Sequence, residues 1–382
     1  MRNVSPTLPV APSGAGDWMS RLRIALLGHW RYGLSEPYSG GLEAHTAMTA
    51  RVLQRAGHVV TVYAGSPAAR RPSDLDVRPV LVTEDDYSAG ERSDNVVPTG
   101  RHQAHDGAHR TVLGDVLDPG RYDVVHNNSL HYLPPLLCST AMTPMVHVVH
   151  CPPFENLSRA HTHRSAQALR RTNNVVAVSE SLRRQWAPLV DGVVLNGVDV
   201  ARWTPNLDAV SDRCAWAGRI VPEKAPHLAL DAARLAGRDI VIAGPIQHRG
   251  YFDTEIAPRL GPSAEWAGHL DHDGLNDLYA SSAVGLVTPR WSEPFGLVAA
   301  EMLACGTPVA AFRRGGLREV IDRSVGRFAR ASTARALAAV IDEAARIDRR
   351  TCRRRAEQVL SVERMASEYV DLYRDAIRVG AV

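Results

Sequence analysis

The apolar segment LRIALL, residues 22–27, decides the fold class of the first part of the chain. A continuous apolar run of this length is typical of a strand that is buried in a parallel sheet. A glycine-containing turn follows it, then a helix expected over residues 42–56, and then a second strand-like run over residues 58–63. Strand, helix and strand in this order indicate a parallel βαβ unit.

The same alternation continues along the chain in two blocks. The last segment, residues 333–382, has a helical pattern, and residues 84–110 are polar, which indicates a long loop with some helix. These patterns predict an α/β protein with two open sheets and a cleft between them, where ligands bind at the carboxyl ends of the strands. Strands are expected at 123–126, 145–150, 175–178, 193–195, 214–217, 240–243, 283–287 and 308–312, and helices of the second block at 224–237, 251–260, 271–281 and 294–305.

Composition sets the domain boundaries that we expect. Residues 1–20 are rich in Pro, Ser, Ala and Gly without an apolar stretch of signal-peptide length, so we expect a disordered leader. A first Rossmann-like domain is expected over 21–195 and a second over 207–361. The turn-rich segment 196–206 between them is expected to be the linker.

Charge and cysteine content exclude several classes of protein. The 382 residues carry a net charge of only +3, which gives no indication of nucleic-acid binding. The five cysteines are scattered without a C-x-x-C pair, as expected for a reducing cytoplasm. No apolar run reaches membrane-spanning length. Of the 44 basic residues only Lys224 is a lysine, which makes that position informative.

The segment SEPFGLVAAE, residues 292–301, points to a ligand. Pro294 suits the first turn of the helix expected at 294–305, so the backbone N–H groups of Phe295, Gly296 and Leu297 would be available to an anion, most often a phosphate. Glu293 and Glu301 are eight residues apart, about 12 Å along a helix. That separation suits two hydroxyl-bearing rings on either side of a diphosphate.

Two further segments have the pattern of phosphate sites. Gly40 and Gly41 follow the first strand and open the first helix, where paired glycines permit close approach of a phosphate; an ordinary helix-entry turn has the same pattern. Arg219 and Lys224 follow a later strand and could converge on a diphosphate, the alternative being solvated charges.

Other polar residues fit either a site or a structural role. His126 and His150 each end a strand and could face the cleft, whereas His147 within the second of these strands is expected to pack. The acidic pairs in residues 74–76 and 271–273 read as a polar turn and a helix cap rather than as metal ligands. The arginine run of residues 346–355 is expected to be a solvated helix face, with contact to an anionic membrane surface as the alternative.

With these residues in place, the chain resembles glycosyltransferase family 4, retaining enzymes of the GT-B fold. The resemblance covers about residues 21–375. The matching elements are Gly40-Gly41, His150 at the end of its strand, Asn196-Gly197-Val198-Asp199, Gly218-Arg219 with Lys224, the Glu293–Glu301 element with Gly306-Thr307-Pro308-Val309, and the Gly315-Gly316…Glu319 turn. The chain departs from the common pattern at Ala225, where many members have glycine, and at Leu317-Arg318, where many have a proline.

The resemblance implies a role for each matching residue. Arg219 and Lys224 would hold the donor diphosphate, and Glu293 would bind hydroxyls of the transferred sugar. His150 would contact the sugar near the reacting centre, and Glu301 would bind the ribose. The expected donor-binding set is completed by Gly40, Gly41, Gly244, Leu270, Phe295, Gly296 and Leu297. In this fold the final helix, about residues 362–382, crosses back to the first domain.

The implied activity is transfer of a hexose from a nucleoside-diphosphate sugar to an acceptor hydroxyl with retention of configuration. A UDP-sugar is the favoured donor, followed by a GDP-sugar, and no metal or other cofactor is expected. Two alternatives stay open: a sugar-nucleotide epimerase or phosphorylase on the same fold, and a catalytically silent protein that binds nucleotide sugars. The acceptor, whether glycan, lipid or small molecule, is not defined by these residues.

Overall fold

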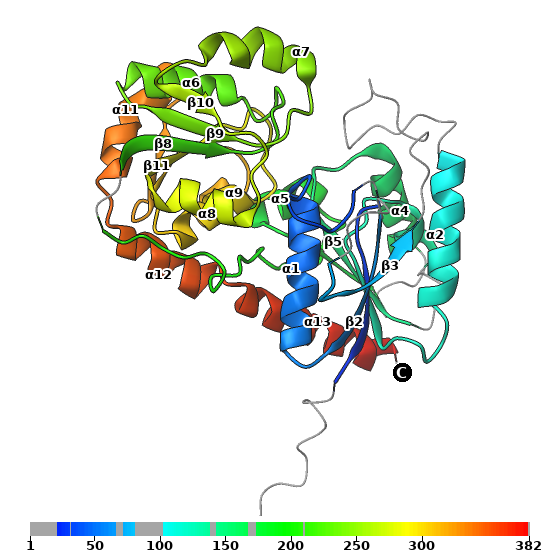
Figure 1. Cartoon of the computed structure of the whole chain (residues 1–382). Coiled ribbons are helices and arrows are strands. Elements are labelled where there is room, and N and C mark those ends of the chain that lie inside the picture. Colours follow the sequence, from blue (N-terminus) through cyan, green and yellow to red (C-terminus); the bar gives the residue numbers. More distant parts are fainter. Residues whose placement is uncertain are drawn as a thin grey trace, which may run out of the picture.

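The computed structural model describes residues 21–30, 32–65, 72–80, 102–137, 143–166, 173–208 and 211–380. The expected leader and most of the expected loop at 84–110 lie outside these ranges, and residues 102–110 of that loop belong to a helix. The described residues form two parallel sheets with helices on their faces, of seven and six strands (Figure 1). The predicted α/β fold with two Rossmann-like domains is therefore confirmed.

The first sheet has the strand order β3-β2-β1-β4-β5-β6-β7, so β2 and β3 lie on one side of β1 and the later strands lie on the other. Its strands are β1 (Arg23–Leu27), β2 (Val59–Gly65), β3 (Asp76–Val80), β4 (Val124–Asn127), β5 (Met145–Val149), β6 (Asn173–Ala177) and β7 (Gly192–Val193). Its helices are α1 (Gly41–Arg55), α2 (His102–Val116), α3 (Leu133–Leu137), α4 (Glu155–Ala166) and α5 (Glu180–Trp186).

The second sheet has the order β10-β9-β8-β11-β12-β13. Its strands are β8 (Ser211–Ala217), β9 (Ile240–Ala243), β10 (Ala264–Trp266), β11 (Ser282–Val287), β12 (Val309–Phe312) and β13 (Gly326–Ala329). The helices are α6 (Pro226–Leu235), α7 (Arg249–Tyr251) with the short turns Phe252–Ile256 and Ala257–Arg259, α8 (His272–Ala280), α9 (Leu297–Ala304), α10 (Leu317–Val320), α11 (Ala334–Ala345), α12 (Arg349–Val359) and α13 (Val362–Gly380).

The central strands of both sheets are apolar on both faces. Residues 24–27 of β1 are fully buried, as are all four residues of β12. This burial explains why continuous apolar runs marked these strands in the sequence. The strands that the sequence did not indicate, β3, β10 and β13, are all at or next to sheet edges and have polar or half-exposed residues.

Two chain segments connect the domains, and they run side by side. The Val198 N–H donates to the Leu360 carbonyl at 2.7 Å, and the Val362 N–H donates to the Val198 carbonyl at 3.0 Å. From there α13 continues onto the first domain, where it packs against α1, β4 and β5 (Figure 1, red). No helix in the described part of the chain is long and apolar enough to cross a membrane.

The arginine run of residues 346–355 extends from the end of α11 into α12, and half of its arginines are directed into the protein. The Arg353 guanidinium donates to carbonyls of the linker and of the last turn of α9, at 2.7 and 2.8 Å. Arg355 donates to the Glu319 carbonyl at 2.8 Å. The prediction of a solvated helix face is therefore wrong for Arg353 and Arg355, whose side chains bind backbone carbonyls.

Arg349 is the most buried member of this run, with 8% of its surface exposed. Its guanidinium donates to the carbonyls of Ser282 and Ala280, each at 2.9 Å, to the Thr307 hydroxyl at 3.0 Å, and to the Asn206 carbonyl. Burial lowers the pKa of this guanidinium. One side chain thus joins α12 to the linker, to the end of α8 and to the start of β11.

We predict that Arg349→Leu lowers the free energy of unfolding by about 3 kcal/mol, because several buried carbonyls lose charged donors at once. Urea denaturation followed by tryptophan fluorescence measures the change. Arg350→Leu is the matched control, since the neighbouring Arg350 side chain is 60% exposed and 4.0 Å from Asp208. Equal effects of the two substitutions would contradict the role of Arg349.

Candidate active site

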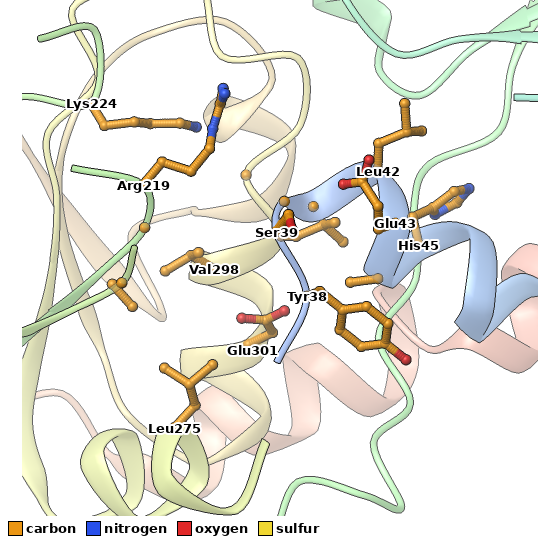
Figure 2. Close-up of a pocket in the computed structure, with 18 of the residues that line it drawn as sticks. Tyr38, Ser39, Leu42, Glu43, His45, Arg219, Lys224, Leu275, Val298 and Glu301 are labelled. Carbon is orange, nitrogen blue, oxygen red and sulfur yellow. The ribbon is translucent and has the colours of Figure 1, made fainter. Parts of the chain in front are cut away.

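A cavity of about 800 Å³ lies between the two domains. It is lined by all twelve residues expected from the sequence: His150, Arg219, Lys224, Glu293, Gly40, Gly41, Gly244, Leu270, Phe295, Gly296, Leu297 and Glu301. Figure 2 shows Arg219, Lys224 and Glu301 on one wall and the α1 residues Leu42, Glu43 and His45 on another. The residues that the sequence singled out are therefore brought around one cavity.

Lys224 sits in a turn that precedes α6, rather than in the helix expected from residue 224. The Thr288 hydroxyl fixes this turn by donating to the carbonyls of Lys224 and Ala225, at 2.9 and 3.1 Å. Ala225 has φ +49°, a left-handed conformation that glycine adopts at lower cost. The alanine at this position is therefore held in a backbone conformation that suits glycine better.

The Lys224 ammonium contacts the Glu293 carboxylate, with 2.7 Å between Nζ and Oε2. Trp291 donates its indole N–H to the same oxygen at 2.8 Å, and its ring centroid lies 5.2 Å from Nζ. Lysine and glutamate side chains are 23% and 12% exposed, so the pair is partly shielded from water. Trp291 was not predicted, although its place two residues before Glu293 could have suggested a contact.

The helix expected from Pro294 begins three residues later, at Leu297, and this part of the prediction was wrong. Gly296 is the N-cap with φ +106°, and a Cβ there would lie 2.4 Å from Leu317, so only glycine fits without displacement. Pro294 and Phe295 therefore precede α9, and Glu293 is not on the helix. The N–H groups of Leu297 and Val298 remain as the helix-start donors.

The loop of residues 291–296 is held from two sides. The Gly316 N–H donates to the Glu293 carbonyl at 2.7 Å within the second domain. From the first domain, the Ser179 hydroxyl donates to the Pro294 carbonyl at 2.6 Å, and Gln185 donates to the Ser292 hydroxyl at 3.0 Å. The backbone that carries Glu293 therefore contacts both domains.

Glu319 adds a second contact between the domains at the same place. Its carboxylate accepts the backbone N–H groups of Glu180 and Ser181 at 2.7 and 2.9 Å, at the start of α5. A carboxylate at a helix start satisfies N–H groups that have no partner within the helix. The Gly315-Gly316…Glu319 turn of the sequence thus supports the loop and docks the first domain.

Arg219 lies on the same wall of the cavity as Lys224 (Figure 2). Its guanidinium donates to Gln247 Oε1 at 3.1 Å, and Gln247 Nε2 donates to the Ser39 carbonyl of the first domain at 3.4 Å. His269 also bonds across the cleft, with 3.0 Å between Nε2 and the Tyr38 carbonyl. The segment that leads to Gly40 is therefore held against the second domain by two side chains that no sequence pattern indicated.

Gly244 borders the cavity at the end of β9. It has φ +141°, and a Cβ there would lie 1.8 Å from the Gly218 carbonyl oxygen. Its N–H donates to the Gly268 carbonyl at 2.7 Å, which positions the turn that carries Leu270. Asp271 begins α8 by accepting the Gly274 N–H at 3.0 Å, as expected for a cap.

Glu301 lies on α9 beside the buried Tyr279. Burial raises the pKa of the Glu301 carboxyl from 4.5 to about 7, and the Tyr279 hydroxyl lowers it in part. The unliganded site therefore disfavours the charged form of this carboxyl group. Strongly shifted pKa values of this kind are common at residues that bind a ligand.

The first-domain wall consists of the start of α1 and the end of β5. A Cβ on Gly41 would lie 3.3 Å from Leu297 of the second domain, so the two helix starts approach closely. Glu43 is 4% exposed and its Oε1 lies 3.6 Å from His29 Nδ1. His150 lines the cavity, with Nε2 at 2.8 Å from Asn128 Oδ1.

Three other polar candidates have structural roles. His126, which the sequence left open as a cleft residue, is fully buried and contacts Asn128 and Tyr373 instead. His147 is buried within β5, as expected. Asp74 pairs with Arg51 at 2.6 Å, which accounts for its carboxylate without a metal ion.

Two family models match the chain. The model described as Glycosyltransferase Family 4 matches residues 39–202, and the model described as Glycosyl transferases group 1 matches residues 210–359. The boundary between the two matches falls close to the linker.

Curated relatives extend over most of the chain. The D-inositol 3-phosphate glycosyltransferase of Mycolicibacterium paratuberculosis is 31% identical over 337 residues, covering 77% of this chain and 75% of the relative. The protein of the same name from Kribbella flavida is 28% identical, covering 79% of this chain and 82% of the relative.

Solved structures match across both domains. Sucrose-phosphate synthase from Thermosynechococcus elongatus has a TM-score of 0.72 and 19% identity, covering 93% of this chain and 98% of that one. Anabaena Alr3699/HepE in complex with UDP and glucose has a TM-score of 0.69 and 17% identity, covering 93% and 100%. Two facing parallel-sheet domains around one cavity define a glycosyltransferase of the GT-B fold. The chain belongs to glycosyltransferase family 4, and its general activity is hexose transfer from a nucleotide sugar.

We predict that Glu301→Gln stabilises the unliganded protein in a pH-dependent way. Because the folded pKa of about 7 is above the unfolded value, the wild type loses stability as the pH rises from about 4.5 to 7. The variant lacks this loss, so its advantage should grow by up to about 1.4 kcal/mol per pH unit over that range and then level off.

Urea unfolding between pH 5 and pH 8 measures this difference. Glu265→Gln, at an exposed position on β10, is the control and should stay within about 0.5 kcal/mol of the wild type throughout. A pH-independent difference for Glu301→Gln would show that the carboxyl is not held in a burial-dominated site.

Proposed function

We propose that the cavity binds a nucleoside-diphosphate sugar with its phosphates between Arg219 and Lys224, its ribose at Glu301 and its sugar at Glu293. The observation that carries the proposal is that two cations and two carboxylates of the second domain line one cavity. Cationic groups suit a diphosphate, and carboxylates accept hydrogen bonds from vicinal hydroxyls. Lys224 would exchange Glu293 for a phosphate oxygen, which leaves Glu293 able to bind sugar hydroxyls.

A UDP-sugar is the first donor that we propose, and a GDP-sugar is the second. The solved structures of Anabaena Alr3699/HepE with UDP, glucose and UDP-glucose support this order. Gly244 and Leu270 would border the base, where backbone approach is closest. The sugar is a hexose of the glucose, mannose or N-acetylglucosamine type.

The chemistry that we propose proceeds with retention of configuration and without a metal ion. Charge develops on the leaving diphosphate, and fixed cations and N–H donors at the start of α9 would stabilise it, each worth about 10²–10³ in rate. His150, Gly40 and Gly41 would approach the reacting centre and the phosphates from the first domain. The acceptor hydroxyl would attack from the leaving-group side, with a donor phosphate oxygen taking its proton.

The acceptor would enter along the first-domain wall. The names of the relatives make D-inositol 3-phosphate the first acceptor to test, followed by other small polyols, glycans and lipid-linked sugars. We propose a cytoplasmic enzyme, where nucleotide sugars are available in a reducing environment. Peripheral membrane contact would involve the exposed arginines of α12, and binding to anionic vesicles measures it.

A thermal-shift screen of UDP-, GDP- and ADP-sugars, followed by product analysis with the acceptors above, tests the function. A bound donor at about 100 times its dissociation constant adds roughly 2.7 kcal/mol of stability. A new sugar nucleotide that forms without an acceptor would identify an epimerase. A sugar 1-phosphate that forms when inorganic phosphate is added would identify a phosphorylase. Binding without any turnover would identify a silent binding protein.

We predict that Lys224→Ala lowers the transfer rate by at least about 10²-fold while the protein stays folded. The missing ammonium can no longer stabilise the leaving diphosphate. Steady-state kinetics and circular dichroism provide the measurement, and Arg290→Ala removes an exposed positive charge nearby as the control. Near-normal turnover of Lys224→Ala would refute the diphosphate assignment.

The two glutamates should differ in what they affect. Glu293→Gln should lower kcat more than it weakens nucleotide binding, because its contacts are to the transferred sugar. Glu301→Ala should weaken nucleotide binding by about tenfold to a hundredfold with a smaller effect on kcat, since it loses charged hydrogen bonds to the ribose. Calorimetry with the free nucleoside diphosphate measures nucleotide binding separately from turnover. If Glu293→Gln weakened nucleotide binding and Glu301→Ala mainly lowered kcat, the ribose and sugar assignments of the two glutamates would have to be exchanged.

A further inference from the structure

A chain of buried hydrogen bonds connects the returning helix α13 to His150 in the cavity. The Tyr373 hydroxyl lies 2.5 Å from His126 Nδ1, and His126 Nε2 lies 2.8 Å from Asn128 Oδ1. The same oxygen lies 2.8 Å from His150 Nε2. Tyr373, His126 and Asn128 are all fully buried, so water cannot replace these bonds at low cost.

The rings in this network are held without charge. Burial lowers the pKa of His126 to about 4 and that of His45 to about 3. The pKa of His150 is also lowered well below its ordinary value, first by burial and then by the neighbouring His45 and His126. The ring centroids of His45 and His150 are 4.9 Å apart. Each ring near neutral pH therefore carries one proton, and its tautomer is defined by its partners.

The partners permit one consistent direction of donation. Asn128 Nδ2 donates to the Thr46 hydroxyl at 3.3 Å, so Oδ1 faces both rings and must accept from both. His126 and His150 then each carry their proton on Nε2, and His126 Nδ1 accepts the Tyr373 hydroxyl proton.

The reverse orientation of the amide leaves a group unsatisfied. With Nδ2 facing the rings, His126 would have to accept on Nε2 and donate from Nδ1 to the Tyr373 oxygen. The tyrosine hydroxyl proton, fully buried, would then have no acceptor in this network. A buried donor without a partner costs about 1–3 kcal/mol, which favours the first orientation.

We propose that Tyr373, His126 and Asn128 are positioning residues that hold His150 in the Nε2–H tautomer. His150 then has its only lone pair on Nδ1, so through that atom it accepts a hydrogen bond from a hydroxyl in the cavity and does not donate one. The helix that returns from the second domain thereby sets the hydrogen-bonding character of a first-domain residue at the site. The effect on turnover rests on the proposed function of His150 at the sugar; the tautomer does not.

The chain offers a matched pair of tyrosines for the test. Tyr369 lies one turn before Tyr373 on α13, is also fully buried and also packs its ring against His126, at 4.8 Å between centroids. Its hydroxyl, in contrast, has no hydrogen-bond partner among the residues that the structure describes. Tyr373→Phe and Tyr369→Phe thus remove the same atom from similar places, and only the first interrupts the network.

The direct measurement is nitrogen-15 NMR of the histidine rings in the full-length protein, with the His150 and His126 signals assigned from His150→Gln and His126→Gln. We expect Nε2–H tautomers for both rings in the wild type and in Tyr369→Phe. In Tyr373→Phe, His126 Nδ1 loses its donor, so both rings should show a population of the Nδ1–H form. A wild-type His150 with its proton on Nδ1, or spectra unchanged by Tyr373→Phe, would overturn the proposal.

The kinetic measurement uses the donor and acceptor found by the screen. Tyr373→Phe should lower kcat roughly threefold to tenfold with the donor KM within about twofold of the wild type, the size of one buried hydrogen bond. Tyr369→Phe should leave both within about twofold. Equal kinetic losses in the two variants would show that the losses come from packing and not from the hydrogen bond. Inactivity of the wild type with every donor would refute the proposed function, and the NMR spectra would then still test the proposed tautomer of His150.

Discussion

The backbone of the loop at residues 291–296 is hydrogen-bonded to both domains, and the geometry of the cavity depends on this. The Gly316–Glu293 bond belongs to the second domain, whereas the Ser179–Pro294 bond joins the loop to the first. Opening of the cleft would break the second bond and keep the first. The Glu293 carboxylate would therefore stay with the second domain and meet the first-domain wall only when the domains are close, as in enzymes that assemble their sites by closure.

The Lys224–Glu293 pair links two parts of ligand recognition. At 2.7 Å and partly shielded, the two charges satisfy each other in the unliganded protein. In the proposed complex a phosphate takes over Lys224, and only then is Glu293 free for sugar hydroxyls. Recognition of the phosphate and recognition of the sugar are thus coupled by one exchange of partners, in which the Glu293 carboxylate keeps hydrogen-bond donors: the Lys224 ammonium before the exchange and sugar hydroxyls after it.

Sequence patterns predicted the parts of the molecule that local rules decide. Buried central strands such as β1 and β9 were found within a residue or so, because continuous apolar runs mark them. The edge strands β3, β10 and β13 were missed, since half-exposed residues leave no such run. The start of α9 was misplaced because Pro294 fits a helix start locally, while the Glu293 carbonyl accepts the Gly316 N–H and the helix begins only after Gly296. The chemistry-bearing residues were found, but their partners Gln247 and Ser179 were not, because those contacts join distant segments. Trp291 was missed although it is only two residues from Glu293. Glu319 was found as part of its turn, but its contact with the start of α5 was not.

The returning helix shows why a buried polar contact says more than burial alone. The amphipathic pattern of α13 predicts a helix that packs on an apolar surface, but that pattern alone does not specify which residue of the helix meets which residue of the first domain. Tyr369 and Tyr373 are equally buried, yet among the described residues only the Tyr373 hydroxyl has a hydrogen-bond partner, so its bond to His126 constrains the register of α13 in addition to the Val362–Val198 bond at the start of the helix. A shift by one residue would move that hydroxyl by about 1.5 Å along the axis and turn it away by about 100°. The same contact that helps to position α13 on the first domain thus connects this helix to the proposed tautomer of His150.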